Sequence, residues 1–596
     1  MRNLTSSLPP LLPALLMLTM VAPERIGVAA VAGQGQGSTR GQNEGDGAPD
    51  PCDQLLTPKG NAEGLHRRCD AAGTGGGAAR GDFNADGFAD LAIGVPYEDV
   101  GGFEDAGVVQ IIYGSSTGLT ATPTSVTTPD DQIFDKATLG RDLAAGDHFG
   151  WALASGDFNG DTYSDLAIGA PGTDIDVRVL NVGSVTIIHG SALGLDAGTV
   201  DNAPTGPPSE GERKGSALVW ADFNGDTFAD LAIGSPYATM RSDGFLCSSF
   251  TSPVQEAGKV YVVYGSPGGL TALGRQILRQ GTCTYPSEVG VGSDSPEAND
   301  RFGSALAAMP RGDFADLVIG VPSEDLGLFD KRDAGVVHIL AGSAVGLSTN
   351  ANINQVLSQD TGGVGGAAED GDQFGRVLAT GNFSGDREAL VVGIPFEDLI
   401  DNTRNDGGAI QVFFQADFRG VATAGSVFIS QSNLSGVSVE TGDLMGWALA
   451  TGDFDGDGRD DLAVGAPGED VSSIVDAGMV AILYGSSTGP STVRTQIWHQ
   501  NSTGILDFAE AGDQFGYALS AWNYGMGSQR DLAIGAPFET VLSTVTGTNH
   551  IEAGAVHVIY GSRTGLAATG NQVWHQDTSG VKDSAQRGDR FGIALY

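Results

Sequence analysis

The stretch that decides the fold is Asp82-Phe83-Asn84-Ala85-Asp86-Gly87-Phe88-Ala89-Asp90, which runs directly into the apolar segment Leu91-Ala92-Ile93-Gly94-Val95-Pro96. Oxygen-bearing side chains stand at its first, third, fifth and ninth positions. Nearly the same stretch returns three times, beginning at Asp157, Asp222 and Asp453. We therefore interpret the rest of the chain as a scaffold that repeats this unit.

The fullest copy of the unit lies between Phe149 and Ser191. It opens with Phe149-Gly150, passes through the acidic stretch from Asp157 and reaches Gly169-Ala170-Pro171. A variable segment and a second apolar run, 183–191, complete it. Short runs that alternate large and small apolar residues and end in Gly or Pro are typical of strands rather than helices.

Two independent counts give seven copies of the unit. The Gly-x-Pro step occurs at Pro96, Pro171, Pro236, Pro322, Pro395, Pro467 and Pro537. The later strand ends at Gly114, Gly190, Gly265, Gly342, Gln415, Gly485 and Gly561, with Gln415 a degenerate copy. A period of about 65 to 85 residues with several strands per unit predicts an all-β, seven-bladed β-propeller.

The two ends of the repeat predict how the ring closes. The first unit has no clear Phe-Gly strand before Asp82, and the chain stops at Phe591-Gly592-Ile593-Ala594-Leu595-Tyr596, which is that strand with nothing after it. We expect this C-terminal strand to complete the first blade, because closure leaves no open sheet edge. The alternative is that 77–81 forms the first strand and the C-terminal strand begins an eighth, truncated blade.

The motifs resemble the FG-GAP repeat. The forms that carry the resemblance are Phe149-Gly150 with Gly169-Ala170-Pro171, and Phe515-Gly516 with Gly535-Ala536-Pro537. Residues 79–596 are similar to the N-terminal propeller of integrin α subunits, and more so to free-standing secreted integrin-like proteins. The resemblance implies calcium in the acidic hairpins and a role in extracellular recognition. The chain has no leg domains, transmembrane helix or cytoplasmic tail, so we expect no integrin-type heterodimer.

The acidic stretches have the donor pattern of a calcium site. Calcium takes six to eight oxygen ligands in a flexible arrangement, whereas magnesium demands strict octahedral geometry. Position twelve is Ile93 where an EF-hand needs Glu, so the stretch is not an EF-hand. We expect about four ions, one per intact loop. The predicted ligands are Asp82, Asn84, Asp86, Phe88 and Asp90; Asp157, Asn159, Asp161, Tyr163 and Asp165; Asp222, Asn224, Asp226, Phe228 and Asp230; and Asp453, Asp455, Asp457, Arg459 and Asp461, the seventh position giving its backbone carbonyl.

The copies of the loop are not equal. The loop from Asp453 has four carboxylates where the others have three, so we expect it to bind calcium most tightly. The fourth unit shortens the loop to 310–316, the fifth has Leu390 at the ninth position, and the seventh keeps only Asp531. We expect no ion in the fourth or seventh unit and at most a weak one in the fifth. The alternative for all copies is that Asp and Asn only cap turns.

A second acidic feature follows the Pro step. It is Glu98-Asp99, Glu324-Asp325, Glu397-Asp398 and Glu469-Asp470. We interpret it as a solvated turn before the next strand. The alternatives are a recognition surface or further cation ligands on one face.

The N-terminal region has the composition of a targeting segment and a linker. Arg2 precedes a short apolar run, 11–22, and small residues follow at 28–32, which predicts a signal peptide over 1–30. Residues 31–78 are predicted to form a flexible Gly- and Ala-rich linker. In an exported chain the four cysteines would form disulfides. Nearest-neighbour pairing joins Cys52 to Cys69 and Cys247 to Cys283, although three connectivities are possible.

Composition limits the function. With 31 Lys+Arg and 73 Asp+Glu the net charge is −42, which argues against a nucleic-acid partner. No His-Glu-x-x-His motif and no phosphate-binding loop occurs. We interpret His189, His338 and His557 as repeat-equivalent packing residues.

The sequence therefore predicts a secreted or cell-surface, calcium-binding propeller that acts as an adhesion or ligand-binding module for an extracellular protein or glycan. No transmembrane segment is expected after signal cleavage. One alternative is an extracellular hydrolase or lyase, since fold does not fix function. Another is a structural envelope or matrix protein.

Overall fold

The computed structural model describes residues 81–596 except 123–128, 176–177, 207–208, 241–252, 282–287, 293–294, 328–330, 351, 400–404, 417–419 and 544–546. The predicted signal peptide (1–30), the predicted linker (31–78) and the four cysteines Cys52, Cys69, Cys247 and Cys283 lie outside the described residues.

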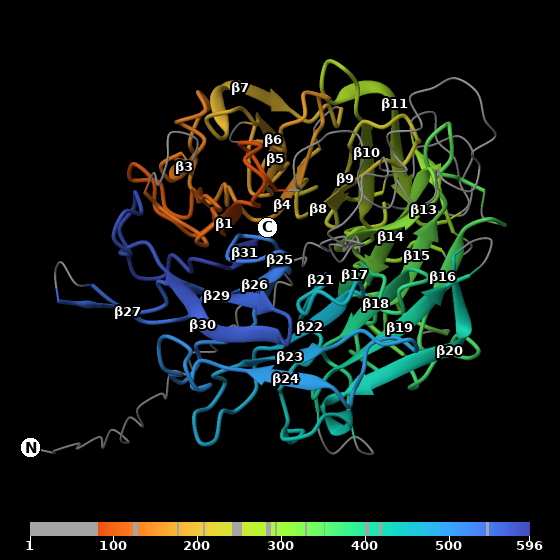
Figure 1. Ribbon diagram of the computed structural model, residues 1–596. Helices are drawn as coiled ribbons and strands as arrows, with labels where there is room; N and C mark the ends of the chain where they lie inside the picture. Colours follow the sequence, from red (N-terminus) through yellow and green to blue (C-terminus); the bar gives the residue numbers. More distant parts are fainter. Residues whose placement is uncertain are drawn as a thin grey trace, which may run out of the picture.

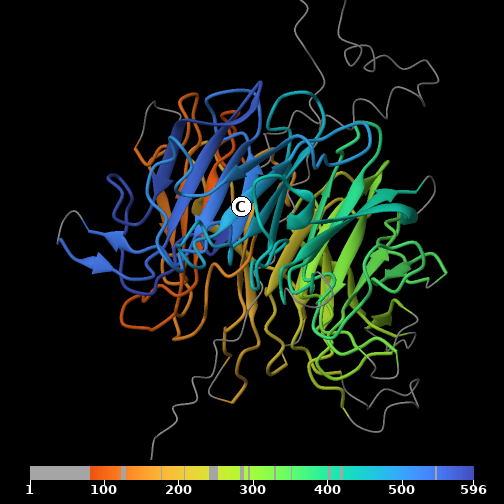
Figure 2. The same cartoon turned by 90° about the horizontal axis from the view of Figure 1, so that it is seen from below.

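Seven antiparallel sheets stand around a common axis as the blades of a propeller (Figure 1). Figure 2 shows the same ring from its edge. The only helix among the described residues is a short 3-10 helix, η3, at Gln431–Asn433. The prediction of an all-β, seven-bladed propeller is confirmed.

The first four blades contain sixteen of the strands, and a closing strand, β31 (Ala594–Leu595), belongs to the first of them. Blade 1 has β1 (Leu91–Val95), β2 (Val108–Ile112) and β3 (Gln132–Phe134). Blade 2 has β4 (Leu153–Gly156), β5 (Asp165–Ala170), β6 (Ser184–His189) and β7 (Asp196–Asn202). Blade 3 has β8 (Ala217–Ala221), β9 (Asp230–Ser235), β10 (Lys259–Tyr264), β11 (Thr271–Arg279) and the short parallel β12 (Val289–Gly290). Blade 4 has β13 (Ala305–Arg311), β14 (Phe314–Val321), β15 (Val336–Leu340) and β16 (Gln355–Leu357).

The last three blades follow the same plan. Blade 5 has β17 (Val377–Gly381), β18 (Ala389–Ile394), β19 (Ala409–Gln415) and β20 (Val421–Ser430). Blade 6 has β21 (Ala448–Gly452), β22 (Asp461–Ala466), β23 (Met479–Leu483) and β24 (Thr495–Trp498). Blade 7 has β25 (Ala518–Trp522), β26 (Asp531–Ala536), β29 (Ala555–Ser562) and β30 (Gly565–Trp574), with a small separate hairpin of β27 (Val541–Leu542) and β28 (Asn549–His550).

Within a blade the inner strands are buried and the outermost strand is the most exposed. The six residues of β5 and the five residues of β1 are all buried, whereas the outermost strand of blade 2, β7, is mostly exposed. The first strands of neighbouring blades contact one another around the axis. The core is therefore made of side chains that each blade presses against the next, in layers rather than around one centre.

Glycine is required where neighbouring blades touch. A Cβ atom added to Gly94 would stand 2.1 Å from the carbonyl oxygen of Gly150, far inside van der Waals contact. Gly94 comes from the Gly-x-Pro step of one blade and Gly150 from the Phe-Gly of the next. The same contact, at 2.0 to 2.4 Å, recurs at all seven junctions: Gly94–Gly150, Gly169–Gly215, Gly234–Gly303, Gly320–Gly375, Gly393–Gly446, Gly465–Gly516 and Gly535–Gly592. The repeated motif is thus two halves of one interblade contact.

The C-terminal strand closes the ring as predicted. β31 pairs antiparallel with β1, with Ile93 opposite Leu595, and occupies the place that β4 has in blade 2. Backbone bonds between Ala92 and Tyr596 extend the pairing. The Tyr596 hydroxyl accepts a hydrogen bond from Trp220 Nε1 at 2.8 Å and donates one to the Ser155 carbonyl at 2.9 Å.

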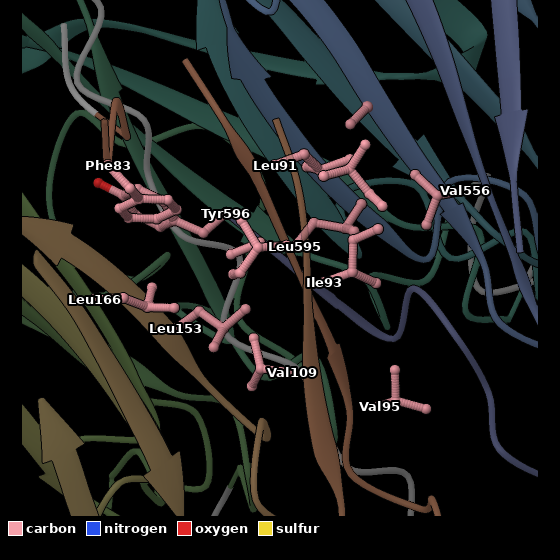
Figure 3. Close-up of a cluster of buried hydrophobic side chains, with 14 of the residues drawn as sticks. Phe83, Leu91, Ile93, Val95, Val109, Leu153, Leu166, Val556, Leu595 and Tyr596 are labelled. Atoms are coloured by element: carbon pink, nitrogen blue, oxygen red, sulfur yellow. The ribbon is translucent and has the colours of Figure 1, made fainter. Parts of the chain in front are cut away.

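The closing strand is also packed by apolar side chains from three blades. Figure 3 shows Leu595 beside the β1 side chains, with blade 2 on one side and blade 7 on the other. The buried residues around it are Phe83, Leu91, Ile93, Val95, Val109, Leu153, Leu166, Val556 and Tyr596. The alternative of an eighth, truncated blade is therefore wrong.

Candidate metal sites

The four intact acidic loops fold in the same way. In the first loop, Asp82 accepts hydrogen bonds from the backbone N–H of Asp86 at 3.0 Å and of Gly87 at 2.8 Å. The Asn84 side-chain oxygen also accepts from Asp86 N–H, and Asp86 accepts from Phe88 N–H, both at 3.0 Å. These bonds wrap the chain around its own carboxylates and bring the predicted ligands to the inside of one tight turn.

The same bonds recur at the equivalent positions of blades 2, 3 and 6. The first-position carboxylates Asp157, Asp222 and Asp453 each accept two bonds on one oxygen and one on the other. The fifth-position carboxylates Asp161, Asp226 and Asp457 accept the N–H of Tyr163, Phe228 and Arg459. In blades 2, 3 and 6 the loop joins the first and second strands, and in blade 1 it precedes β1, so all four lie at the ends where the second strands begin.

The ninth-position aspartate has a second role that the sequence did not reveal. Both oxygens of Asp90 accept backbone bonds, one from Phe83 N–H at 2.8 Å and one from Gly114 N–H at 3.0 Å. Gly114 lies between the third and fourth strands, so the carboxylate ties two turns together. Asp165, Asp230 and Asp461 make the same pair of bonds.

This structural role persists where the loop is lost. Asp531 in blade 7 accepts from Tyr524 N–H at 2.8 Å and from Gly561 N–H at 2.9 Å. In blade 5 the aspartate is replaced by Leu390, and the glycine whose N–H would donate to it is replaced by Gln415. The Gln415 N–H bonds instead to the Glu388 carbonyl at 2.8 Å. A signal for this role was present in the sequence, because the only degenerate Gly and the only missing ninth-position Asp fall in one unit.

The donor set of these loops fits calcium. In blade 6 the carboxylate oxygens of Asp453, Asp455 and Asp461 lie within 4.8 Å of one another, and all three residues are buried. Burial raises the pKa of Asp461 to about 8 and of Asp82 to about 6, because the charged form loses its hydration. A divalent cation in such a turn would offset this desolvation, and hard oxygen donors are the ligands that calcium takes. Phe88, Tyr163, Phe228 and Arg459 would supply the backbone carbonyl.

Basic side chains stand against two of the loops. Arg494 Nη1 pairs with Asp455 in blade 6, and Arg459 pairs with Asp457 at 3.3 Å. In blade 2, His189 Nδ1 lies 3.2 Å from Asp165, whose hydrogen bond raises the pKa of His189 to about 9. A cation in either loop therefore shares its carboxylates with a charged side chain.

The three degenerate units have the shapes that their sequences predict. In blade 4, β13 and β14 pair as far as Arg311 opposite Phe314, so a tight two-residue turn replaces the loop. In blade 5, Asn382 and Asp386 remain at the turn beside Ser384. In blade 7, the Asn523 side-chain oxygen accepts from Gly525 N–H at 3.1 Å. Whether any of these three units holds an ion stays a prediction.

The interpretation of the second acidic feature as a solvated turn is wrong. Its glutamates are buried, with exposed fractions of 3% for Glu98 and 8% for Glu469. Each accepts a hydrogen bond from a glutamine that follows the last strand of the preceding blade. These Gln–Glu pairs, called the junction pairs below, are Gln576–Glu98, Gln280–Glu324, Gln359–Glu397, Gln431–Glu469 and Gln500–Glu539.

The junction pairs lie at the opposite end of the blades from the acidic loops, because each glutamate follows a second strand. Two junctions use other residues. Between blades 1 and 2, Lys136 lies at the glutamine position and pairs with Asp147 at 2.8 Å. Between blades 2 and 3, Lys214 and Lys259 face Glu212.

Three carboxylates meet at the junction between blades 6 and 7. Glu510, Asp513 and Glu539 have carboxylate oxygens within 4.8 Å of one another. Burial and the neighbouring charges raise the pKa of Glu539 to about 9 and that of Asp513 to about 6. Protonation of Glu539 removes most of the repulsion at this junction.

The histidine interpretation is half right. His338 and His557 are buried and pack edge-on against Phe302 and Phe515, at ring distances of 5.3 Å and 5.2 Å. His189 is not their equivalent, since the residue of β6 opposite Ile168 is Thr186, whereas His338 and His557 stand opposite Ile319 and Ile534. His338 and His557 stand four residues before the strand-ending Gly342 and Gly561, whereas His189 stands one residue before Gly190.

A family comparison identifies FG-GAP repeats in this chain at residues 74–112, 149–188, 214–263 and 445–483. These are blades 1, 2, 3 and 6, the four with intact acidic loops. The chain thus carries FG-GAP repeats, and the resemblance stated from its motifs is confirmed.

Relatives of two kinds align with parts of the chain. Phosphatidylinositol-glycan-specific phospholipase D of Bos taurus is 34% identical over 180 residues, 29% of this chain and 18% of the relative. Integrin alpha-PS2 of Drosophila melanogaster is 33% identical over 202 residues, 32% of this chain and 13% of the relative. Integrin alpha-5 of Xenopus laevis is 25% identical over 281 residues, 46% of this chain and 22% of the relative. The chain therefore spans less than a quarter of the length of each.

The comparison with a solved structure shows only a weak likeness. A solved subtype N11 neuraminidase-like protein from a flat-faced bat source covers 71% of this chain and 84% of its own, at a TM-score of 0.31 and 9% identity, and that likeness carries no argument. Among the described residues, no helix is long and apolar enough to cross a membrane.

Proposed function

Because this chain carries FG-GAP repeats like those of integrin α chains, we propose that it is a calcium-stabilised propeller that acts as an extracellular ligand-binding or adhesion module. Its expected place is secreted or at the cell surface, and its expected ligand an extracellular protein or glycan. The observation that carries the proposal is the hydrogen-bonded turn that the four intact loops share, which in blade 6 brings the buried carboxylates of Asp453, Asp455 and Asp461 within 4.8 Å of one another.

In this proposal calcium stabilises the scaffold at one end of the blades, and the ligand binds at the opposite face. Each loop leads into the second strand of its blade, and its ninth-position aspartate also ties the turn between the third and fourth strands. In blades 2, 3 and 6 the loop also follows the first strand, so an ion held there connects all four strands at one end. The face at the other end is built by connections that vary in length and sequence between blades, as a binding surface requires.

Native mass spectrometry of the secreted chain with and without calcium, paired with a thermal melt in chelator, tests the proposal. We expect four bound ions and a large drop in melting temperature when calcium is removed, because an ion that binds only the folded state stabilises it by mass action. No bound ion together with an unchanged melt would reduce the loops to turn caps.

A hydrolase is the second candidate, because relatives of the chain include phospholipases D. The aligned part is 18% of the bovine enzyme's length, so its activity is not transferred to this chain. Incubating the purified protein with a glycosylphosphatidylinositol-anchored substrate discriminates the two. Turnover would favour the enzyme, and saturable binding without turnover would favour the module.

A further inference from the structure

A cavity opens on the axis at the end where the first strands begin. Its volume is about 190 Å³, and its walls come from five consecutive blades, from Tyr97 after β1 to Arg376 before β17. The acidic loops lie at the other end of the same strands. This cavity is therefore separate from the candidate calcium sites.

The charge of this cavity is opposite to that of the protein. The chain has 73 acidic and 31 basic residues, yet the lining of the cavity includes Arg213, Arg301 and Arg376 and no aspartate or glutamate. The lining also includes one histidine, His148. Guanidinium groups that line one cavity repel one another, and an anion bound in the cavity would reduce this repulsion.

The three arginines are held in place by aromatic rings. The Arg213 guanidinium lies 4.5 Å from the centre of the Tyr237 ring and the Arg301 guanidinium lies 5.0 Å from it. Arg376 lies 5.0 Å from the Trp447 ring and donates to the Gln373 side-chain oxygen at 2.7 Å. Stacking on neutral rings fixes the direction of a guanidinium without neutralising it.

Two of these arginines, Arg213 and Arg301, can form an ion pair with a ligand. In the part of the chain that the structure describes, Arg213 forms no ion pair. Arg301 pairs with Glu256 at 3.3 Å, and both side chains are more than a third exposed, so solvent screens that pair. An incoming carboxylate would meet at least one unpaired guanidinium and a second that is only weakly paired.

The rest of the wall indicates which kind of molecule carries the anion. Ser216, Ser304 and Asn181 offer neutral hydrogen-bonding groups, and Tyr97 and Trp151 add two aromatic rings that contact each other edge-to-face. The volume is below the roughly 300 to 1,000 Å³ of sites that hold drug-sized ligands, so one compact unit fits. A carboxylate suits the planar fork of arginine, hydroxyl groups suit the serines and asparagine, and the apolar face of a sugar ring suits the aromatic wall.

We propose that this cavity binds a uronic acid unit, with its carboxylate held by Arg213 and Arg301 and its ring against Tyr97 and Trp151. The proposal rests on the proposed function only in taking the propeller as a ligand-binding module, and it names the class of ligand. An acidic side chain of a peptide is the competing source of a carboxylate, and the test separates the two.

The test is isothermal titration of the full chain, saturated with calcium, with D-glucuronate, D-glucose and an acidic tripeptide. Of the three ligands, we expect only glucuronate to bind. We expect added salt to weaken this binding, because the contact is ionic. The Arg213→Gln variant should lose about ten-fold or more in affinity, since it removes a charge-assisted contact. Arg213→Lys should recover part of it, because the charge remains and the fork is lost. Arg332→Gln, which removes a 74%-exposed arginine outside the cavity, is the matched control and should bind normally.

Three outcomes would overturn the proposal: equal binding of glucose, stronger binding of the tripeptide, or no binding of glucuronate. A thermal melt of each variant in calcium keeps folding separate from binding. Because every titration is made with calcium present and the melt intact, a failure here leaves the calcium proposal standing. Loss of the calcium-dependent melt would contradict that proposal without affecting this one.

Discussion

The side chain of Gln576, at the end of the last blade, donates a hydrogen bond from Nε2 to Oε2 of Glu98 in the first blade at 2.6 Å. The two residues are 478 positions apart in the chain. The same glutamine-to-glutamate bond joins four other pairs of blades, so the last junction of the ring is built like the earlier ones. A closed ring of equivalent junctions, rather than a stack with two ends, is the basis of the predictions below.

Replacing a buried junction glutamate should flatten the dependence of stability on pH. Burial raises the pKa of Glu397 to about 8, so the folded state keeps a proton that the unfolded chain loses above pH 4.5. The folded state then binds more protons, and stability falls as pH rises from about 4.5 to 8. In Glu397→Gln this part of the fall should vanish, an effect on the order of 5 kcal/mol at most. Denaturant unfolding across pH measures it.

The control for that experiment is Glu210→Gln, which alters an exposed glutamate. It should leave the pH profile of the wild type unchanged. A Glu397→Gln profile as steep as that of the wild type would show that the junction glutamate is ionised in the folded protein.

Adding one methyl group at a blade junction should destabilise the ring strongly. A Cβ at Gly465 would stand 2.1 Å from the Gly516 carbonyl oxygen, which is backbone and cannot move aside. We expect Gly465→Ala to cost about 3 kcal/mol or more in the free energy of unfolding. Gly362→Ala, which meets nothing within 4 Å, should change it by less than about 0.5 kcal/mol. Similar costs for the two variants would contradict the packing argument.

A comparison of Asp461 with Asp531 tests whether the ninth-position aspartate binds calcium in addition to its structural role. Asp461 and Asp531 make the same two backbone bonds, but only Asp461 belongs to an intact loop. Asp531→Asn should lower the melting temperature equally with and without calcium. Asp461→Asn should cost more in calcium than in chelator, by up to about 3 kcal/mol when the ion is in hundred-fold excess over its Kd. Equal calcium dependence of the two would rule out Asp461 as a ligand.

The order of calcium affinities depends on a basic neighbour. The loop from Asp453 is predicted to bind most tightly, yet Arg494 pairs with Asp455 there. Because this arginine is about half exposed, its removal should tighten calcium binding only by about two- to five-fold. Calcium titration of Arg494→Gln checks this, with Arg332→Gln as the control. Weaker binding in Arg494→Gln would mean that the arginine supports the loop.

A tyrosine hydroxyl at the closing junction should matter as much as its counterpart inside the ring. Tyr560 in blade 7 accepts a bond from Leu119 N–H in blade 1 at 2.9 Å, and Tyr484 in blade 6 accepts one from Leu566 N–H in blade 7 at 3.1 Å. Tyr560→Phe and Tyr484→Phe should each cost about 1 to 3 kcal/mol, because each leaves a buried N–H without its acceptor. A neutral Tyr560→Phe beside a costly Tyr484→Phe would indicate an open ring.

Several features of this protein could be predicted from the sequence because they repeat. Seven Gly-x-Pro steps and a stray Phe-Gly strand at the end were enough for the blade number and the closure, since each glycine serves a contact that every junction needs. The four acidic loops were equally readable, because their ligands lie within nine residues of one another. Local spacing determines what such a turn can hold.

What the sequence could not give were partners from different blades. Glu98 was predicted to be solvated because Gln576 is distant in the chain, and the second role of Asp90 depends on Gly114, beyond the following strand. Arg213, Arg301 and Arg376 come from three different blades, and they line one cavity only because the blades are arranged in a ring. The sequence by itself determined the repeated unit and its closure, because these rest on short-range patterns. The tertiary structure alone decided which charges are buried and which converge, because burial and convergence depend on contacts between blades.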